Sequence, residues 1–342
     1  MINRLVWMET DNTYPYRNLA MEEYMTLHVP QGTCILYLWQ NRHTVVIGKN
    51  QNCWRECRVN FLEQESGYLV RRLSGGGAVF HDLGNLNFTF IVGAGDYDVS
   101  RQLDVILEAV RSLGIHAEKT RRNDITVDGR KFSGNAFYRT GDGCYHHGTI
   151  LIRADKENMS RYLNVSKEKL ASKGVTSVKS RVANLCEFKP DITLEEVKSA
   201  LVEAFSKVYG QPAVRMEEGE LPQPDIDART EKFASWQWKY GRKIPFEYEM
   251  EKRFPWGNIQ IQFHVDEGMI QDVNVFSDAM DQEMIGMLAE QLKGCAYAEE
   301  DICRAVKAVG TDAFQAGEYT GADEPQSCRI KEDIMTLVRE SL

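Results

Sequence analysis

The stretch best suited to chemistry lies at residues 71–82, where two arginines, a serine and three consecutive glycines precede an apolar run. Glycine loses more backbone entropy on folding than any other residue, so three in succession require a reason. One reason is a loop whose backbone N–H groups converge on an anion, beside arginines that supply forked, permanently charged donors. The other interpretation is a glycine-rich turn with solvated arginines, because short glycine motifs often match by chance. The segment alone leaves both interpretations open.

Lys131 is the second candidate for chemistry. Asp128 and Gly129 form a strong hairpin-turn signal just before it, which places the lysine at the start of the returning strand. A lysine there is usually a solvated charge, but the small residues Ser133 and Gly134 that follow suit the close approach of a ligand. An anion-binding loop and a separate lysine fit the attack of a carboxylate on the α-phosphate of ATP, because positive charge is needed where two anions meet. Composition and spacing carry the inference no further.

Two other kinds of site are disfavoured. A serine hydrolase of the common α/β type needs a Gly-x-Ser-x-Gly elbow, which the chain lacks. His81 and Asp82 are sequence neighbours, which seldom face each other in a strand. A metal site built from His146 and His147 fails for the same reason, since adjacent strand residues point to opposite faces of a sheet.

The elements that position these residues follow from hydrophobic periodicity and turn signals. The glycine loop is predicted to lie between two strands, at residues 68–72 and 78–81. A Walker loop or a dinucleotide fingerprint opens a helix instead, so neither fits here. A helix is predicted at residues 18–27 with Asn18 as its N-cap. Residues 211–230, rich in Pro, Glu and Asp, have the composition of a loop or linker.

The composition is typical of a globular protein, with 43% hydrophobic and 27% charged residues over 342 positions, and the length predicts about two domains. The net charge of −9 argues against nucleic-acid binding. The charge is uneven: residues 1–245 carry 33 Lys and Arg against 30 Asp and Glu, whereas residues 246–342 carry 8 against 20. We therefore predict one domain at residues 1–245 and a smaller α+β domain at residues 246–342.

The chain has no apolar run typical of a signal peptide at its start, and no segment reaches the roughly 18 apolar residues of a membrane span. We expect a cytoplasmic protein that binds neither membrane nor nucleic acid. The 8 cysteines are scattered along the chain, which predicts reduced thiols rather than a disulfide framework.

Several ordered motifs together resemble those of the lipoate–protein ligase A family of the bacterial type. The matching segments are residues 71–85, 129–136 and 146–149, with further family-like segments at residues 18–23, 48–52 and 174–182. The likeness covers nearly the whole chain and includes residues 253–257 in the C-terminal part. Several motifs in the right order and at the right distances are far more specific than one glycine triplet.

The resemblance implies an α/β fold, with a biotin-ligase-like catalytic domain built on a mixed β-sheet and a small α+β C-terminal accessory domain. It implies two half-reactions, in which lipoate and MgATP give lipoyl-adenylate and pyrophosphate, and the lipoyl group then passes to a lysine of an acceptor lipoyl domain. Such acceptors belong to the E2 subunits of 2-oxoacid dehydrogenases or to the glycine-cleavage H protein. The cofactors implied are ATP and Mg²⁺, and the enzyme is expected to be a monomer.

The same resemblance implies roles for individual residues. Lys131 is the implied catalytic residue, contacting both the lipoyl carbonyl and the phosphate. Gly76 and His147 line the lipoate slot with it, and Asn123 and Asp124 are candidates for holding Mg²⁺ or for orienting Lys131. ATP and the adenylate are bound, by the same resemblance, by Lys131, by Arg72 and by the backbone of Gly77, Ala78, Val79 and Phe80.

Two alternatives stay open. Within the same fold, an octanoyl- or lipoyltransferase takes its acyl group from a carrier protein, and a cysteine-dependent version uses a thiol. Cys144 is the cysteine nearest in sequence to Lys131 and the histidine pair, but no motif supports it as a nucleophile. From a different class, a regulatory module of the biotin-repressor type lacks catalysis, but the chain shows no helix-turn-helix before the catalytic-like part and is acidic.

Overall fold

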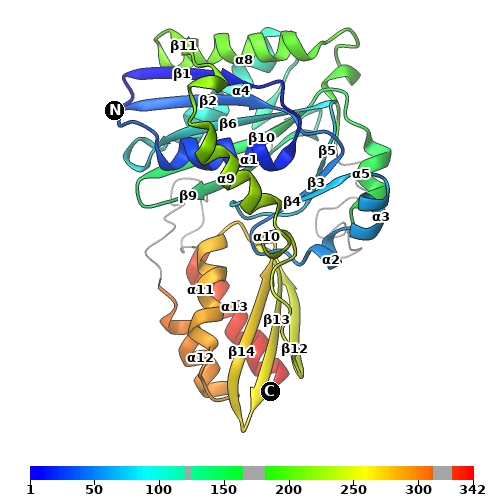
Figure 1. Ribbon diagram of the computed structural model, residues 1–342, viewed down its shortest axis with the longest axis vertical. Helices are drawn as coiled ribbons and strands as arrows, with labels where there is room; N and C mark the ends of the chain where they lie inside the picture. The colour runs from blue at the N-terminus through cyan, green and yellow to red at the C-terminus, as the bar shows by residue number, and fades with distance from the viewer. Residues whose placement is uncertain (120–124, 165–181, 311–325) are drawn as a thin grey trace. The chain divides into compact units, whose positions relative to one another are not determined.

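The computed structural model describes residues 1–119, 125–164, 182–310 and 326–342, and the chain divides into two compact units (Figure 1). The first unit contains Met1–Val46, Trp54–Arg72 and Val79–Lys239. The second contains Ile47–Cys53, Leu73–Ala78 and Tyr240–Leu342. The second unit therefore combines the C-terminal part of the chain with two short loops from its first 80 residues.

A large mixed sheet is the centre of the first unit, with strand order β11-β1-β2-β6-β10-β9-β8-β7. Its strands are β1 (Arg4–Glu9), β2 (Thr33–Trp39), β6 (Asn85–Gly93), β7 (Glu118–Lys119), β8 (Ile125–Val127), β9 (Arg130–Arg139), β10 (Gly143–Leu151) and β11 (Ala213–Arg215). β1 runs parallel to both β11 and β2, and the other pairs are antiparallel. β2 is buried along its full length, so helices must cover the sheet on both sides.

Helices lie on both faces of this sheet (Figure 1). The longer ones are α1 (Pro15–Leu27), α4 (Val99–Ser112), α8 (Leu194–Tyr209) and α9 (Gln223–Ala234). On one face, Gln102 of α4 reaches His146 of β10, and Phe205 of α8 packs on Phe90 of β6. Shorter helices are α2 (Cys53–Glu56), α3 (Val59–Gln64), α5 (Lys156–Tyr162) and α10 (Trp236–Tyr240). Among the described residues, no helix is both long and apolar enough to cross a bilayer.

The opposite face of the sheet carries α1. Glu22 of this helix reaches Thr89 of β6 and His147 of β10. The neighbouring Glu23 accepts from Arg229 and Lys232 of α9, so two acidic residues on one helix hold it to the sheet and to a second helix.

The glycine loop joins two strands of a smaller, separate sheet. That sheet has the order β4-β3-β5, with β3 (Thr44–Ile47) antiparallel to β5 (Val79–His81), and the loop follows β4 (Tyr68–Arg71). The predicted strand-to-strand setting of the loop is confirmed.

β8 and β9 form the predicted hairpin. Asp128 and Gly129 have φ angles of 49° and 71°, which is the positive pair that a two-residue type I′ turn requires. The register between the two strands then shifts by one residue, so β9 carries a bulge near its start. A bulge reverses the usual alternation of faces, and Lys131 and Gly134, three residues apart, come to share one face.

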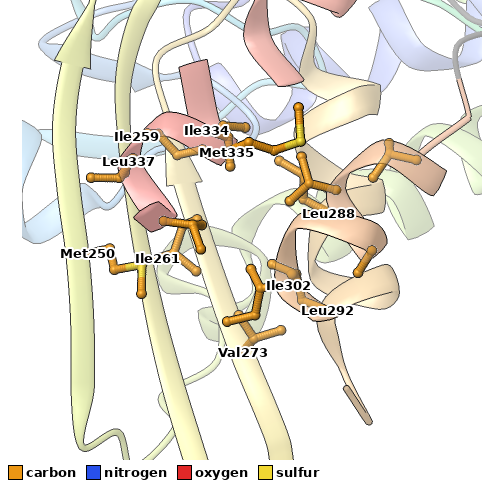
Figure 2. Packing of buried hydrophobic residues seen from close by; sticks show 14 of the residues in the cluster. Met250, Ile259, Ile261, Val273, Leu288, Leu292, Ile302, Ile334, Met335 and Leu337 are labelled. Atoms are coloured by element: carbon orange, nitrogen blue, oxygen red, sulfur yellow. The ribbon is translucent and has the colours of Figure 1, made fainter. Parts of the chain in front are cut away.

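The C-terminal part of the second unit is a three-stranded antiparallel sheet with helices packed on one face. Its elements are β12 (Tyr248–Phe254), β13 (Gly257–Asp266), β14 (Met269–Ser277), α11 (Gln282–Leu292), α12 (Glu299–Ala308) and α13 (Gln326–Ser341). Ile259, Ile261 and Phe263 alternate along β13 and are buried in one apolar cluster with Leu288 and Ile334 (Figure 2). The α/β fold class, with a mixed sheet and a small α+β part, is confirmed.

Two local predictions are wrong. The first helix begins at Pro15, whose fixed φ suits the first helical turn, and Asn18 lies inside it, buried, with its side-chain amide donating to Gln40 O at 2.8 Å. Residues 211–230 are not a linker, because they hold β11, which pairs with β1, and the start of α9. Pro222 and Pro224 stand at the beginning of α9, where proline costs little, and Pro212 directly precedes β11.

Candidate active site

One face of the large sheet carries three rows of side chains across β2, β6, β10 and β9. Residues paired across neighbouring strands point to the same face, so the strand register defines each row. In that strand order the rows are Trp39-Asn87-Thr149-Gly134, Tyr37-Thr89-His147-Ala136 and Ile35-Ile91-Tyr145-Tyr138. Polar side chains are seldom gathered under a helix without a purpose. This face, which α1 overlies, is called the polar face below.

Glu22 organises the middle row of the polar face. Its side chain is 1% exposed, and its Oε1 accepts from Thr89 Oγ1 at 2.7 Å and lies 2.8 Å from His147 Nδ1. Thr89 Oγ1 in turn accepts from Trp39 Nε1 at 3.0 Å. A buried carboxylate is costly unless donors surround it, so this network fixes both the carboxylate and the orientation of the His147 ring.

Arg72 and His81 add a buried charge and a neutral imidazole. Arg72 is 5% exposed and donates to Val46 O at 3.3 Å. Burial lowers the pKa of Arg72 to about 10, against the opposing influence of Tyr145 and Glu22, so the guanidinium remains charged at neutral pH. Burial, followed by the charge of Arg72, lowers the pKa of His81 to about 3, so this ring is uncharged at neutral pH.

Lys131 lies at the bulged start of β9, and its ammonium group covers Gly134. A Cβ on Gly134 would stand 2.6 Å from Lys131 Nζ and 2.7 Å from its Cε, so only glycine leaves room for this arrangement. Gly134 pairs with Thr149, whose Oγ1 lies 3.4 Å from the Gly134 N–H. The Ala183 N–H donates to Lys131 O at 2.9 Å and holds the backbone. The lysine charge is therefore positioned at the β9 end of the first row of the polar face.

His146 lies on the other face of the sheet and has a structural role. Its Nε2 is 2.9 Å from Asn135 Oδ1 and its Nδ1 is 3.1 Å from Gln102 Oε1. Burial lowers the pKa of His146 to about 3. The prediction that the two adjacent histidines point to opposite faces is confirmed, since His147 faces Glu22 of α1.

The buried, neutral His81 and His146 predict a loss of stability in acid. Their pKa values in the folded protein, about 3, lie below the value of about 6.5 expected in the unfolded chain. Between these values the unfolded state binds more protons, so the free energy of unfolding falls as the pH is lowered, by about 1 kcal/mol per pH unit for each histidine below pH ~6. Urea unfolding at a series of pH values measures this slope. His146→Gln should reduce it, whereas His116→Gln, at an exposed position, should leave it unchanged.

The glycine loop belongs to the second unit, and the structure explains two of its three glycines, Gly75 and Gly76. Gly76 has a φ of 86° and donates its N–H to Ala279 O at 3.0 Å. A Cβ on Gly75 would stand 2.5 Å from Ala279 O and 2.6 Å from Met280 O, and one on Gly48 would stand 2.2 Å from Gly76 O. These neighbours are backbone atoms that no rotamer change can move, so a side chain is excluded at Gly75 and at Gly48.

The residues predicted for the site are divided between the two units. The first unit contains Arg72, Val79, Phe80, Lys131 and His147. The second unit contains Gly76, Gly77 and Ala78. Within the first unit, Glu22 interacts electrostatically with Arg72 and lies within hydrogen-bond distance of His147. Lys131 lies on the same polar face as His147. The Phe80 ring is buried against Tyr162 at 5.3 Å, so its side chain is committed to packing.

The predicted Mg²⁺ candidates, Asn123 and Asp124, lie outside the described residues. Among the residues that are described, no three His, Cys, Asp or Glu side chains are grouped as metal ligands.

Sequence reasoning missed three polar residues of this face: Glu22, Asn87 and Thr89. A signal existed for two of them, because Asn85, Asn87 and Thr89 recur at every second position of an otherwise apolar strand. That period indicates one polar face on a buried strand. Glu22 had no such signal, since its partners come from strands far along the chain.

Comparison with known proteins identifies the family to which the chain belongs. The family described as lipoyl protein ligase A/B catalytic domain matches residues 14–206, more than half of the chain, and the chain belongs to this family. The bacterial lipoate protein ligase C-terminus matches residues 243–321, so both parts of the chain agree with the resemblance seen in the sequence.

Solved structures agree with this assignment. LipL1 of P. falciparum, determined in complex with lipoate, is 28% identical, with a TM-score of 0.81 over 97% of this chain and 99% of that one. A bi-partite lipoate protein ligase of Thermoplasma acidophilum, described with its E2 lipoyl domain, is 26% identical, with a TM-score of 0.61 over 71% of this chain and 99% of that one. A lipoate-protein ligase A bound with ATP shares the fold at 24% identity and a TM-score of 0.60, over 70% of this chain and 99% of that one.

Proposed function

We propose that this protein is a lipoate–protein ligase, which activates lipoate with MgATP and transfers the lipoyl group to a lysine of an acceptor lipoyl domain. The observation that carries the proposal is the Lys131 ammonium held over Gly134 on the same polar face as His147. Membership of the lipoyl protein ligase family supports the reaction class, and the likeness to a protein solved with lipoate supports the acyl substrate.

In the first half-reaction, a carboxylate oxygen of lipoate attacks the α-phosphorus of ATP and pyrophosphate leaves. Two anions approach each other, so fixed positive charge at their meeting point lowers the barrier. Lys131 supplies a compact charge to the acyl oxygen and the phosphate, and Arg72 supplies a forked one to ATP. His147, oriented by Glu22, lines the slot for the lipoyl group.

In the second half-reaction, the neutral amine of the acceptor lysine attacks the acyl carbon of the adenylate. The carbon–oxygen bond to AMP breaks, AMP leaves with the bonding electrons, and the nitrogen loses a proton as the amide forms. Lys131 then stabilises the negative charge that develops on the acyl oxygen. The archaeal relative described with its E2 lipoyl domain supports an acceptor of this kind. We propose that the acceptors are the lipoyl domains of 2-oxoacid dehydrogenase E2 subunits or the glycine-cleavage H protein.

Mg²⁺ enters the proposal as the counter-ion of the ATP phosphates. The described residues offer no cluster of ligands for it, so no step is assigned to the metal.

A transferase that draws its acyl group from a carrier protein is the second candidate, because the family includes both A and B types. A cysteine-dependent transferase needs a reactive thiolate. Cys144 is fully buried, and burial raises its pKa to about 11, which leaves it protonated at neutral pH. The match of residues 243–321 to the family described as bacterial lipoate protein ligase C-terminus also favours the ligase.

Exchange of radiolabelled pyrophosphate into ATP tests the proposed function. Purified protein should catalyse exchange only when lipoate is present, with octanoate and biotin as comparison acids. Addition of an acceptor lipoyl domain should then yield the lipoylated lysine and AMP. Acyl transfer from a carrier protein without ATP, and no exchange with any acid, would establish the transferase instead.

Arg72→Ala should raise the apparent KM for ATP by about 10-fold, because one charge-assisted contact to phosphate is worth about 1.5–3 kcal/mol. Arg71→Ala is the matched control, since the Arg71 side chain donates to the backbone carbonyls of Trp238 and Lys239 at 3.0 and 2.8 Å. We expect Arg71→Ala to lower the unfolding midpoint and to leave the KM for ATP unchanged. Unchanged KM and kcat in Arg72→Ala would remove Arg72 from the ATP site.

A further inference from the structure

One buried amide on the polar face has no part in the mechanism above. Asn87 of β6 is 1% exposed, and its Oδ1 accepts from Asn85 Nδ2 at 2.9 Å. Its Nδ2 has no hydrogen-bond partner within the described part of the chain. A buried, unsatisfied amide donor costs about 1–3 kcal/mol, so such a group calls for an explanation.

The strand register places Asn87 in the same row as the proposed catalytic lysine. Asn87 pairs with Thr149 of β10, and Thr149 pairs with Gly134 of β9, over which the Lys131 ammonium lies. Neighbouring strands are about 5 Å apart, so Asn87 and Gly134 flank Thr149 at a separation of about 10 Å. A carboxylate above Thr149 is therefore within reach of a donor from each side.

Two of the atoms that lack partners around this row, Asn87 Nδ2 and His81 Nε2, are donors, whereas the nearby Asn85 Oδ1 is an acceptor. His81 is neutral, and its Nδ1 lies 3.3 Å from Asn41 Nδ2, so Nδ1 accepts and Nε2 carries the proton. His81 Nε2 has no partner among the described residues, and the ring packs edge-on against Trp39, the β2 neighbour of Asn87. Two unsatisfied donors and one ammonium are complementary to a group that only accepts, and a carboxylate is such a group.

We propose that the Asn87 side-chain amide donates a hydrogen bond to the carboxylate of the acyl substrate, on the oxygen that Lys131 does not hold. This inference rests on the proposed function for the identity of that substrate. It assigns Asn87 to substrate binding and makes the site selective for an ionised acid over its uncharged amide.

Asn87→Asp tests the inference, because it replaces the free donor by an acceptor of equal size and keeps the oxygen that binds Asn85. Calorimetric titration with lipoate and with lipoamide gives the two affinities. We expect Asn87→Asp to weaken lipoate binding by about 10- to 100-fold, the range for a hydrogen bond to a charged group, and to weaken lipoamide binding much less. A structural role alone would weaken both ligands equally, and that result would overturn the inference.

Two further variants keep the test decisive. Asn87→Ala removes the donor without adding charge, and it provides the test if the aspartate variant does not fold. We expect Asn87→Ala to weaken lipoate binding by about 10-fold and lipoamide binding much less. Gln102→Glu is the matched control, since Gln102 is also a fully buried amide with an Nε2 that lacks a partner in the described ranges, but it lies on the opposite face beside His146. Its ratio of lipoate to lipoamide affinity should equal that of the wild type.

Measurements on the wild-type protein distinguish a failure of the proposed function from a failure of the role proposed for Asn87. Absence of lipoate-dependent pyrophosphate exchange in the wild type would reject the proposed function itself. Normal exchange in the wild type, with an unchanged ratio of lipoate to lipoamide affinity in both Asn87 variants, would reject only the role of Asn87.

Discussion

Replacing Lys131 with alanine should reduce lipoate-dependent pyrophosphate exchange by about 1,000-fold and leave the fold intact. Removal of one preorganised donor from developing charge costs about 10²- to 10³-fold in rate, and here the donor also carries a full charge between two anions. The Lys131 side chain is only half-buried, and the backbone of Lys131 is held by pairing with Thr126 and Val182 and by the hydrogen bond from the Ala183 N–H, none of which needs the side chain. The midpoint of urea unfolding should therefore stay close to that of the wild type.

Lys207→Ala is the control for the loss of a lysine as such. The Lys207 side chain is 72% exposed and pairs with Glu108 at the surface, so its removal should alter neither exchange nor stability measurably. Near wild-type exchange in Lys131→Ala would refute the assignment of this residue. Lys131→Arg should recover only part of the activity, because a planar guanidinium is larger than the ammonium that fits over Gly134.

Gly134→Ala should lower kcat by about 100-fold with little change in stability. The new Cβ would meet the Lys131 ammonium end at 2.6 Å, and that end is flexible, so the lysine moves and the sheet does not. A displacement of about 1 Å in a reacting group can cost about 10²-fold in rate. The KM for ATP should change much less than kcat, because Arg72 is not disturbed.

The control for this change is Gly141→Ala, where a Cβ meets nothing within 4 Å. A double-mutant cycle adds a sharper criterion: Gly134→Ala should have no further effect when Lys131 is already alanine, since both changes act through the same ammonium group. A full additional loss in the double variant would show that Gly134 acts by another route.

Local signals in the sequence predicted much of the framework around the site. Asp128 and Gly129 adopt the positive φ angles that make a tight hairpin, and this alone places Lys131 at the start of a strand. The apolar, β-rich runs on both sides of the glycines predicted a strand-to-strand loop correctly. In each case the deciding interaction lies within a few residues of the signal.

The parts that the sequence did not predict depend on distant contacts. Gly75 is required because carbonyl groups about 200 positions later approach it, and a glycine triplet by itself does not distinguish such packing from an anion cradle. Lys131 and Gly134 share a face only because pairing with β8 introduces a bulge. Residues 211–230 have the composition of a loop, yet Ile226 packs into the core once α9 lies against α1.

The second unit is built from three separate stretches of chain. Three hydrogen bonds join the two loops of this unit to its C-terminal stretch. The Ser277 N–H donates to Asn50 O at 2.9 Å, Asn50 Nδ2 donates to Gln282 O at 2.7 Å, and the Gly76 N–H donates to Ala279 O at 3.0 Å. Cutting the chain after residue 239 would separate each of these donors from its acceptor. A two-chain version of this protein could therefore complete its smaller unit only after the two chains had met.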